Sequence, residues 1–290
     1  MSIPIGTGRF SALIDPFGAE LKSLYDRREG REYIWCGDPA WWKGSAPVLF
    51  PIIGGLKDGT YRYKGNTYSL GSHGFARSSR FRVVSSTSDQ LVLELNDSTD
   101  TRKIYPFAFS LQVTVSADYA GMSVGYQVHN PDGTEPLYFS IGSHPAFNLP
   151  FAEGILENYY LHFGSSETSL RHYFSNGCLT GRTGRVFANS RQIFLSRTLF
   201  DDGPVIFTDI ASREVSICKS RSESRIVLQY DAPCLAVWAK PKGSPFLCIE
   251  PWHGIPDPED FDGSLEQKPG IVRLAGGDTF TTGYSIQIVS

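Results

Sequence analysis

Hydrophobic and polar residues alternate in short runs along most of the 290-residue chain. The stretches 91–95, 111–115 and 124–128 each place an apolar side chain at every second position, with polar side chains between them. A period of two is typical of strands that bury one face. The links NDSTD, SADYAG and NPDG have the composition of plain turns. The pattern therefore predicts an all-β fold of antiparallel strands, each with one apolar and one polar face.

Strands are expected from near the N-terminus almost to the end of the chain. They fall at 2–14, 60–63, 67–70, 81–85, 90–95, 109–116, 122–129, 138–143, 205–208, 214–218, 225–230, 234–239, 246–249 and 279–289. The stretch 16–35 fits either a short helix over 19–28 or two strands joined across 26–30, and its Pro and Gly residues favour the strands. The periodicity is weak from 153 to 196. Because no linker or repeat divides the chain, 1–290 is expected to form a single domain, a large antiparallel β-sandwich.

Composition narrows the class of ligand. The chain has 27 basic and 30 acidic residues, a net charge of −3 and a pI of about 6.1, without charge blocks. This balance indicates no basic surface of the kind that binds nucleic acid or an anionic membrane. No apolar run reaches the ~18 residues of a membrane span. The five cysteines include no CxxC pair and no secretory signal is visible, so we expect reduced thiols in a cytoplasmic protein that is a monomer or homodimer.

Two polar side chains stand directly before prolines at predicted strand ends. Proline cannot donate to a sheet ladder, so the strand that carries His144 is expected to stop at Pro145 with the imidazole on its polar face. Glu250 precedes Pro251 in the same way, on a strand face that it shares with Cys248. Burying a carboxylate in such an apolar strand is costly unless the group is paired or used. Taken singly, each residue also has a structural explanation, as a strand-end histidine or a glutamate paired with a base.

A further histidine lies in the segment GSHGFAR. His73 is flanked by Gly71 and Gly74, so the backbone there can approach a ligand closely. The segment 41–55, WWKGSAPVLFPIIGG, is too rich in Pro and Gly for a helix and too apolar for an exposed loop. We expect it to be packed irregular chain that lines something. His253 lies beside the Glu250 strand and is interpreted as local structure.

Three segments considered together, SHGFAR, GSHPAFN and CIEPWHGIPD, resemble the aldose 1-epimerase (galactose mutarotase) family, and most closely its LacX-like branch. The resemblance extends over about the whole chain. It implies a galactose mutarotase-like β-supersandwich with an open sugar-binding cleft and no cofactor. It also implies that His144 is the general acid at the ring oxygen, that Glu250 is the general base at the anomeric hydroxyl, and that His73 holds the sugar and assists at the ring oxygen.

The same resemblance points to residues that bind the sugar. LacX-like chains usually have an arginine where this chain has Gly55, and the candidates to replace it are Lys57, Arg77 and Lys43. The family also places a substrate-binding aspartate before the strand that matches 205–208. Of the two aspartates found there, Asp202 ranks first. Trp252 offers a platform on which a pyranose face can stack, and is equally compatible with the core.

Three classes of function are compatible with these residues. The first is a mutarotase that interconverts the α and β anomers of an aldohexose by acid/base ring opening. The alternative is a non-catalytic carbohydrate-binding or sensing protein of the same fold, which the missing arginine favours. A metalloenzyme would also use two histidines and a carboxylate, but His73, His144 and Glu250 lack short ligand spacing, so no metal is expected. The partner is a small-molecule sugar of unspecified identity, free or phosphorylated.

Overall fold

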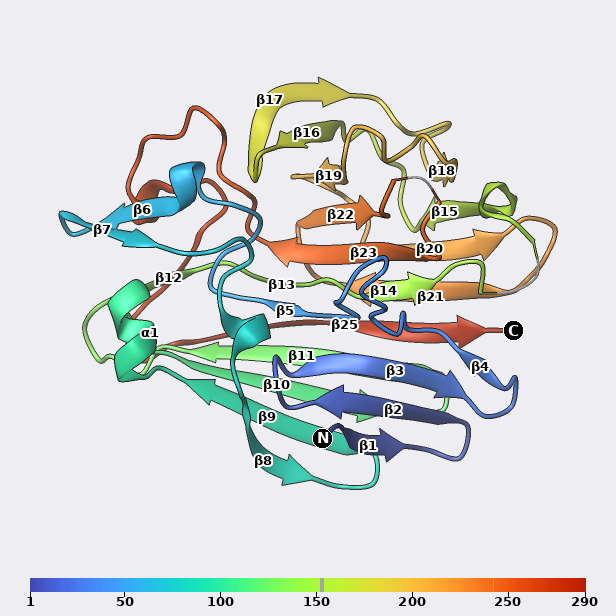
Figure 1. Ribbon diagram of the computed structural model, residues 1–290, viewed down its shortest axis with the longest axis horizontal. Coiled ribbons are helices and arrows are strands. Elements are labelled where there is room, and N and C mark those ends of the chain that lie inside the picture. The colour runs from blue at the N-terminus through green and yellow to red at the C-terminus, as the bar shows by residue number, and fades with distance from the viewer. Residues whose placement is uncertain (152–153, 242) are drawn as a thin grey trace.

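The computed structural model describes residues 1–151, 154–241 and 243–290. Strands make up nearly all of its regular structure, and they pair in antiparallel sheets (Figure 1). One α-helix, α1 (Thr99–Ile104), occurs in these ranges, and no helix there is long and apolar enough to span a membrane. Short 3₁₀ turns are η1 (Lys57–Gly59), η2 (Ala76–Ser78), η3 (Leu156–Asn158) and η4 (Leu265–Gln267). The all-β antiparallel fold expected from the alternation is confirmed.

The larger sheet has nine strands. They are β8 (Arg82–Ser86), β9 (Gln90–Asn96), β10 (Ser110–Ala117), β11 (Gly121–His129), β15 (Tyr159–Phe163), β18 (Gln192–Phe194), β20 (Glu214–Lys219), β21 (Arg225–Tyr230) and β25 (Thr279–Val289). Their order is β18-β15-β20-β21-β25-β11-β10-β9-β8. Buried residues alternate with half-buried polar ones along β10, as the period of two predicts. One face of this sheet therefore contributes to the core.

The second large sheet has eight strands. They are β5 (Val48–Leu49), β13 (Ile141–Ser143), β14 (Ala146–Asn148), β16 (Arg171–Ser175), β17 (Cys178–Gly184), β19 (Val205–Phe207), β22 (Cys234–Trp238) and β23 (Phe246–His253). The order is β17-β16-β19-β22-β23-β13-β5, and β14 also pairs with β23. Phe207, Leu235 and Ile249 of this sheet belong to the same buried cluster as the apolar face of the nine-stranded sheet. The two sheets thus pack face to face as a sandwich.

A four-stranded N-terminal sheet covers another part of the core. It consists of β1 (Ile3–Gly6), β2 (Phe10–Asp15), β3 (Glu20–Asp26) and β4 (Arg31–Glu32), and β1 and β2 contact β9 and β10. Strands β3 and β4 lie in the stretch that fitted helix or strands, so the choice of strands is confirmed. Two ladders complete the chain, β6 (Thr60–Tyr63) with β7 (Asn66–Ser69) and β12 (Leu137–Phe139) with β24 (Val272–Leu274).

Two expectations need comment. The link 96–100 was expected to be a plain turn, and this is wrong, because α1 begins at Thr99. Ser98 caps it by accepting a hydrogen bond from the Thr101 amide, and the Thr101 hydroxyl accepts one from the Ser98 amide, which makes a local capping box. The weakly periodic stretch from 153 contains β15, β16, β17 and β18, while Glu153 itself lies outside the described residues.

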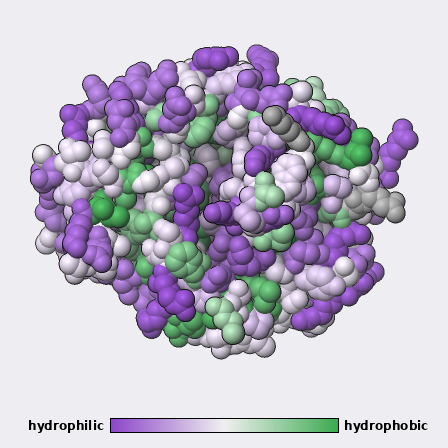
Figure 2. Space-filling model, in the orientation of Figure 1, coloured by the Kyte–Doolittle hydropathy of each residue, from purple (hydrophilic) through white to green (hydrophobic). Residues whose placement is uncertain are grey.

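Both faces of the eight-stranded sheet are largely apolar. Its second face, turned away from the nine-stranded sheet, holds two small buried clusters. One includes Ile206, Ala236 and Trp252, and the other includes Phe246 and Cys248. On the face of the molecule shown in Figure 2, hydrophilic residues predominate and hydrophobic ones form only small groups. Polar chemistry on the second face of this sheet would therefore lie in an apolar setting.

Strand β25 should be essential for folding, because it lies between β21 and β11 in the middle of the nine-stranded sheet. Deleting residues 279–290 would leave two unpaired strand edges and remove the buried side chains of Tyr284, Ile286 and Ile288. We expect the truncated chain to be insoluble or to lack a cooperative unfolding transition in circular dichroism. Deletion of residues 1–2, which precede β1, is the control and should leave that transition in place. A soluble, cooperatively unfolding protein without 279–290 would contradict this role of β25.

Candidate active site

A cavity of about 300 Å³ opens on the second face of the eight-stranded sheet. Ionisable and aromatic side chains make up most of its lining. The lining residues are Trp42, Gly54, His73, Arg77, His144, Phe174, Pro204, Ile206, Trp238, Glu250, Trp252 and Pro256. The cavity thus brings together all three residues predicted to be catalytic, His73, His144 and Glu250, although they lie far apart in the chain.

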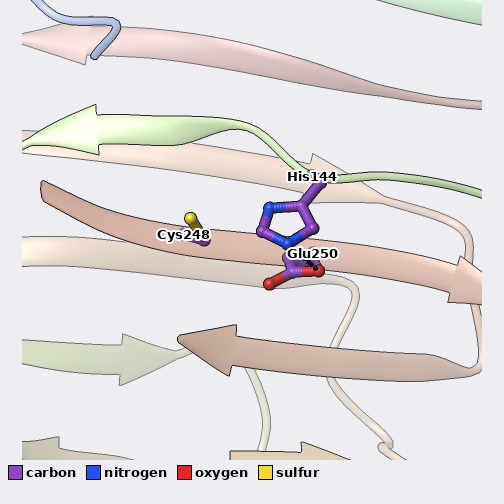
Figure 3. A group of neighbouring side chains, drawn as sticks. All are labelled: His144, Cys248 and Glu250. Atoms are coloured by element: carbon purple, nitrogen blue, oxygen red, sulfur yellow. Dashed lines mark ion pairs between the residues drawn. The ribbon is translucent and has the colours of Figure 1, made fainter. Parts of the chain in front are cut away.

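His144 lies where one neighbour of β23 gives way to another. β13 pairs with β23 through Ile141 and Gly142, β14 pairs with it through residues 146–148, and His144 and Pro145 form the interruption between them. The strand stops before His144, as the sequence predicted. Across this interruption the imidazole Nε2 lies 3.2 Å from Oε2 of Glu250. Gly142 faces Trp252 and Ala146 faces Cys248, so the same register sets His144 opposite Glu250 and places the two side chains in contact on one face (Figure 3).

The expectation that Pro251 stops the Glu250 strand is wrong, because β23 continues through Pro251 to His253. The Ile249 amide donates to the Pro145 carbonyl, 3.1 Å away. Amides two residues apart point to the same side of a strand, so the nitrogen of Pro251 faces the same interrupted ladder. The missing N–H therefore falls between the stretches of β23 that pair with β13 and with β14.

Burial controls the charge state of the pair. The side chains of His144 and Glu250 are 11% and 3% exposed. Burial raises the pKa of the Glu250 carboxyl well above its usual range, and burial together with neighbouring His73 lowers the pKa of His144 well below its own. Both shifts favour a neutral imidazole beside a protonated carboxyl. Among the described residues, Oε2 of Glu250 has no hydrogen-bond partner, so the 3.2 Å contact lacks the geometry of a hydrogen bond.

His73 is held by the backbone of Gly54. The His73 amide donates to the Gly54 carbonyl over 2.8 Å, and the Gly54 amide donates to Nδ1 of the His73 ring over 3.1 Å. An acceptor at Nδ1 places the ring proton of the neutral imidazole on Nε2. Burial, assisted by the charge of Arg77, lowers the pKa of His73 to about 3. His73 is therefore a neutral hydrogen-bond donor at physiological pH and lacks the proton that a cationic acid would supply.

Tryptophans form the walls around the pair. Trp42 stacks on the His144 ring with centroids 4.7 Å apart, and Trp238 meets the same ring edge-on at 5.9 Å. Trp252 lies next to Gly142, where a Cβ atom would approach its ring to 2.6 Å, so glycine is needed for this packing. The segment 41–55 was predicted to line something, and through Trp42 and Gly54 it does.

Sequence reasoning missed Trp42, Trp238 and Phe174 as individual lining residues. A sequence signal existed for Trp42, because it belongs to the apolar segment interpreted as a lining. Trp238 reaches the cavity because its strand pairs with β23 in a register that sets it beside Cys248. That register depends on long-range pairing, which the alternation of residues does not encode.

The structure brings only some of the predicted sugar-binding residues to the cavity. Arg77 and Trp252 line it. Asp202 lies in an exposed turn before β19 outside the lining, and the carbonyls around that turn accept hydrogen bonds from the buried Arg171. Lys57 lines a different pocket, because its amide is tied to Asp257. The sugar-binding roles of Asp202 and Lys57 therefore stay predictions that the resemblance alone supports.

Gly55 and Lys43 also lie outside the cavity lining, and Lys43 is exposed. A Cβ atom on Gly55 would lie 2.6 Å from the carbonyl oxygen of Gly177, which the Gly55 amide already contacts at 2.8 Å. An arginine at this position would therefore have to displace backbone. The packing of the chain thus disfavours arginine at position 55. Within the described ranges, Arg77 is the cationic side chain that lines the cavity.

A larger groove, of about 910 Å³, lies over the outer face of the nine-stranded sheet. It is lined mainly by Ser, Thr and Gly, with Arg213, Glu214 and Asp231 at the surface. It is wide and shallow, and none of its lining residues is a histidine. Of these two hollows the smaller cavity is the better candidate, because a buried imidazole–carboxyl pair lies in its lining.

Cys248 adds a third potential ligand beside the pair. One ligand atom each from His144, Cys248 and Glu250 lies within 4.8 Å of the others, and the three side chains come from neighbouring segments (Figure 3). A bound cation would require an ionised thiol and carboxylate. Burial and the nearby Glu250 raise the pKa of Cys248 well above its usual value, so this setting favours the protonated ligands instead.

The fold and the site define a class of protein, a β-sandwich with a buried imidazole–carboxyl pair in an aromatic cavity. Residues 1–268 match the family model described as aldose 1-epimerase, and the chain belongs to this family. It is 28% identical to the chromosomal protein LacX of Lactococcus lactis subsp. lactis, with all of both chains covered.

Solved structures extend the comparison. A galactose mutarotase related enzyme from Lactobacillus acidophilus is 34% identical and superposes with a TM-score of 0.92, covering 100% of this chain and 98% of that one. A galactose mutarotase-like protein from Lactobacillus casei is 28% identical, with a TM-score of 0.91 and full coverage of both chains. The fold is therefore the galactose mutarotase-like sandwich that the sequence motifs implied.

Metal removal gives a direct test of the Cys248 cluster. Because the setting favours protonated ligands, prolonged dialysis against a chelator should leave mutarotation of an aldose unchanged, and elemental analysis should find less than one equivalent of zinc or iron. The matched control is Cys248→Ser, which should behave in the same way before and after dialysis. Loss of activity that zinc or iron restores in the wild-type protein but not in Cys248→Ser would show that the cluster holds a working metal.

Proposed function

We propose that this protein is a cofactor-independent aldose 1-epimerase that interconverts the α and β anomers of an aldohexose. The observation that carries the proposal is the buried contact of 3.2 Å between His144 Nε2 and Glu250 Oε2 in a cavity large enough for a monosaccharide. The two oxygens of a cyclic hemiacetal share one carbon atom, so a single short acid–base pair can reach both. We further propose a cytoplasmic protein that works as a monomer or homodimer on a small-molecule sugar.

Ring opening needs one proton removed and one added. Glu250 takes the proton of the anomeric hydroxyl, the electrons of that O–H bond form the carbonyl, and the bond between the anomeric carbon and the ring oxygen breaks. The ring oxygen keeps the electron pair of that bond and receives a proton from His144. Rotation about the bond between the first two carbons presents the other face of the aldehyde, and the reverse transfers close the ring.

The pair holds one proton throughout this cycle. Before ring opening the reactive form is a protonated His144 beside an ionised Glu250, and after it the imidazole is neutral and the carboxyl protonated. Burial favours the second form, as the directions of both pKa shifts indicate. In the free protein the proton must therefore first move across the 3.2 Å contact to His144. The ring-opening step then returns the pair to the form that the apolar setting prefers.

The remaining lining supports a sugar in place. The neutral His73 offers Nε2–H to the ring oxygen or a hydroxyl, which fits a positioning donor more closely than a second acid. Trp252 provides an indole face and an Nε1–H that has no partner among the described residues. Arg77 adds a cationic donor at the cavity. We propose that these three side chains hold the sugar over the pair.

A non-catalytic sugar-binding or sensing protein remains the second candidate. The observation in its favour is the sparse polar lining, since Asp202, Lys57 and Lys43 all lie outside the cavity. A site with few directed donors would bind free sugars weakly, and weak binding with slow turnover is also what a sensor could show. The two candidates differ in one measurable property, the rate of anomer exchange.

Removing the base or the acid should abolish most of the rate. Glu250→Gln keeps the shape of the side chain but not its basicity, so kcat should fall by roughly 10² to 10⁴ while sugar binding persists, and His144→Asn should act alike. Polarimetry or a coupled dehydrogenase measures the rate after subtraction of a protein-free blank, because sugars mutarotate spontaneously.

Glu223→Gln is the matched control for these two variants, since it changes an exposed acidic residue outside the cavity lining, and its kcat should stay within a few-fold of the wild type. A Glu250→Gln protein with full kcat would dismiss the proposed base. Wild-type protein that binds aldoses but is no faster than the blank across a panel of them would assign the chain to the sugar-binding class.

The buried carboxyl of Glu250 should also lower the free energy of unfolding. The folded-state pKa of Glu250 is raised above the ordinary 4.5, so the native state holds a proton that the unfolded state releases. The stability of the wild type should therefore fall as pH rises above about 4.5, and Glu250→Gln should remove this loss. We expect Glu250→Gln to be more stable by roughly 1 kcal/mol at pH 7 to 8, with the difference shrinking towards pH 4.

Denaturant unfolding at several pH values measures this difference. Glu223→Gln, at an exposed position, is the control and should show no such trend. If Glu250→Gln were less stable than the wild type at pH 8, the carboxyl would be ionised and compensated in the folded protein.

A further inference from the structure

The orientation of His73 depends on the backbone of Gly54, and Gly54 depends on another segment. Gly54 has a positive φ of 63°, and a Cβ atom there would collide with the ring of Pro256. Glycine therefore allows the loop 54–57 to lie directly against Pro256. Both Gly54 and Pro256 line the cavity, so this contact forms part of its wall.

Asp257, the next residue, fastens three segments together with its backbone and side chain. Its amide donates to the Gly55 carbonyl at 3.1 Å, and its carboxylate Oδ2 accepts the Lys57 amide at 2.9 Å. Its carbonyl accepts the Leu179 amide at 2.8 Å, which ties in the hairpin of β16 and β17. The hairpin contributes Phe174 to the cavity. One residue thus joins the loop that holds His73 to two other parts of the wall.

The second carboxylate oxygen is committed to a buried lysine. Nζ of Lys268 lies 2.5 Å from Oδ1 of Asp257 and 2.8 Å from the carbonyl of Ile255, and the two side chains are 1% and 2% exposed. Neither charged side chain lines the cavity. Burying an ion pair gains little net stability over apolar residues of the same shape. A role in fixing the geometry of these segments accounts for the pair better than a role in stability.

We propose that Asp257, braced by Lys268, is a positioning residue that orients His73 for the sugar. This inference rests on the proposed mutarotase function for its kinetic consequence. The carboxylate holds the Lys57 amide, this anchors the loop 54–57, and the loop presents the Gly54 carbonyl and amide to His73. With Nδ1 occupied by the Gly54 amide, the Nε2–H of His73 is fixed as the donor at the cavity. If the anchor shifts, the ring is free to turn or to change tautomer.

A double-mutant cycle separates this role from a general loss of stability. Asp257→Asn should lower kcat/KM by about 10- to 100-fold, as expected for a displaced binding group. His73→Asn should also lower it, and adding Asp257→Asn to His73→Asn should cause no further loss beyond about threefold, because Asp257 acts through His73. If the two losses multiply, the proposal is overturned.

The matched control uses another buried aspartate that is paired with a cation. Asp26 is fully buried and paired with Arg9 at 2.7 Å in the N-terminal sheet, outside the cavity lining. Asp26→Asn should lower the unfolding midpoint, yet leave kcat/KM within threefold of the wild type. Asp257→Glu serves if Asp257→Asn does not fold, since it keeps the charge and displaces the anchor by one methylene group. It should lower kcat/KM in the wild-type background but not in His73→Asn.

A second readout needs no catalytic activity. Nitrogen-15 NMR of the His73 ring should show the Nε2–H tautomer in the wild type, without titration between pH 5 and 8. Asp257→Glu or Asp257→Asn should shift the ring towards a mixture of tautomers, and Asp26→Asn should not. An unchanged tautomer in a folded Asp257 variant would overturn the proposal. Failure of the mutarotase function alone would appear as a wild-type rate equal to the blank with this tautomer shift intact.

Discussion

The buried contact between His144 and Glu250 is the constraint on which the arrangement of the site depends. A carboxyl and an imidazole on the apolar second face of a sheet lose their hydration, and the described protein returns no hydrogen bond to Oε2 of Glu250. The surrounding tryptophans help to bury both groups, and burial is the main cause of both pKa shifts. A group held in this way contributes reactivity at the expense of stability, which is the usual relation at active sites.

The register of β23 with its neighbours makes this contact possible. Gly142 faces Trp252 and Ala146 faces Cys248, so one register runs through both β13 and β14 and sets His144 opposite Glu250. Residues that face each other across an antiparallel pair point to the same side of the sheet, which brings the two side chains together. Pro145 and Pro251 lie beside the pair, where their missing N–H groups leave no donor unpaired.

The fold could be predicted from the sequence more completely than the candidate site. The alternation of apolar and polar residues predicted the apolar faces of β10 and β11, because a strand with one buried face has an apolar residue at every second position. Pro251 was misjudged, since the cost of a proline depends on what lies across from its nitrogen, and that is a long-range property. Helix α1 was missed because a capping box of Ser98 and Thr101 also reads as turn chemistry.

The candidate site residues also differ in whether local sequence or long-range pairing decides their position. His144, Glu250 and His73 were found because proline and glycine mark their positions locally. Asp202 and Lys57 were chosen by residue type near matching motifs, and backbone ties set both of them outside the cavity. Trp238 enters the cavity only through the register of two strands. Local sequence features thus identify the candidate reactive residues, whereas the residues that line the cavity around them can be identified only from the complete fold.

The character of those walls bears on what the site can distinguish. Indole faces make contact with the C–H groups of a sugar ring and are tolerant of which hydroxyls point up or down. Directed hydrogen bonds discriminate far more sharply, because a missing partner leaves a buried polar group unpaired. The ionisable side chains that line this cavity are His73, Arg77, His144 and Glu250. In the proposed mutarotase, recognition would therefore be concentrated on the atoms around the anomeric centre, which all aldoses share, and less on the remaining hydroxyls, by which they differ.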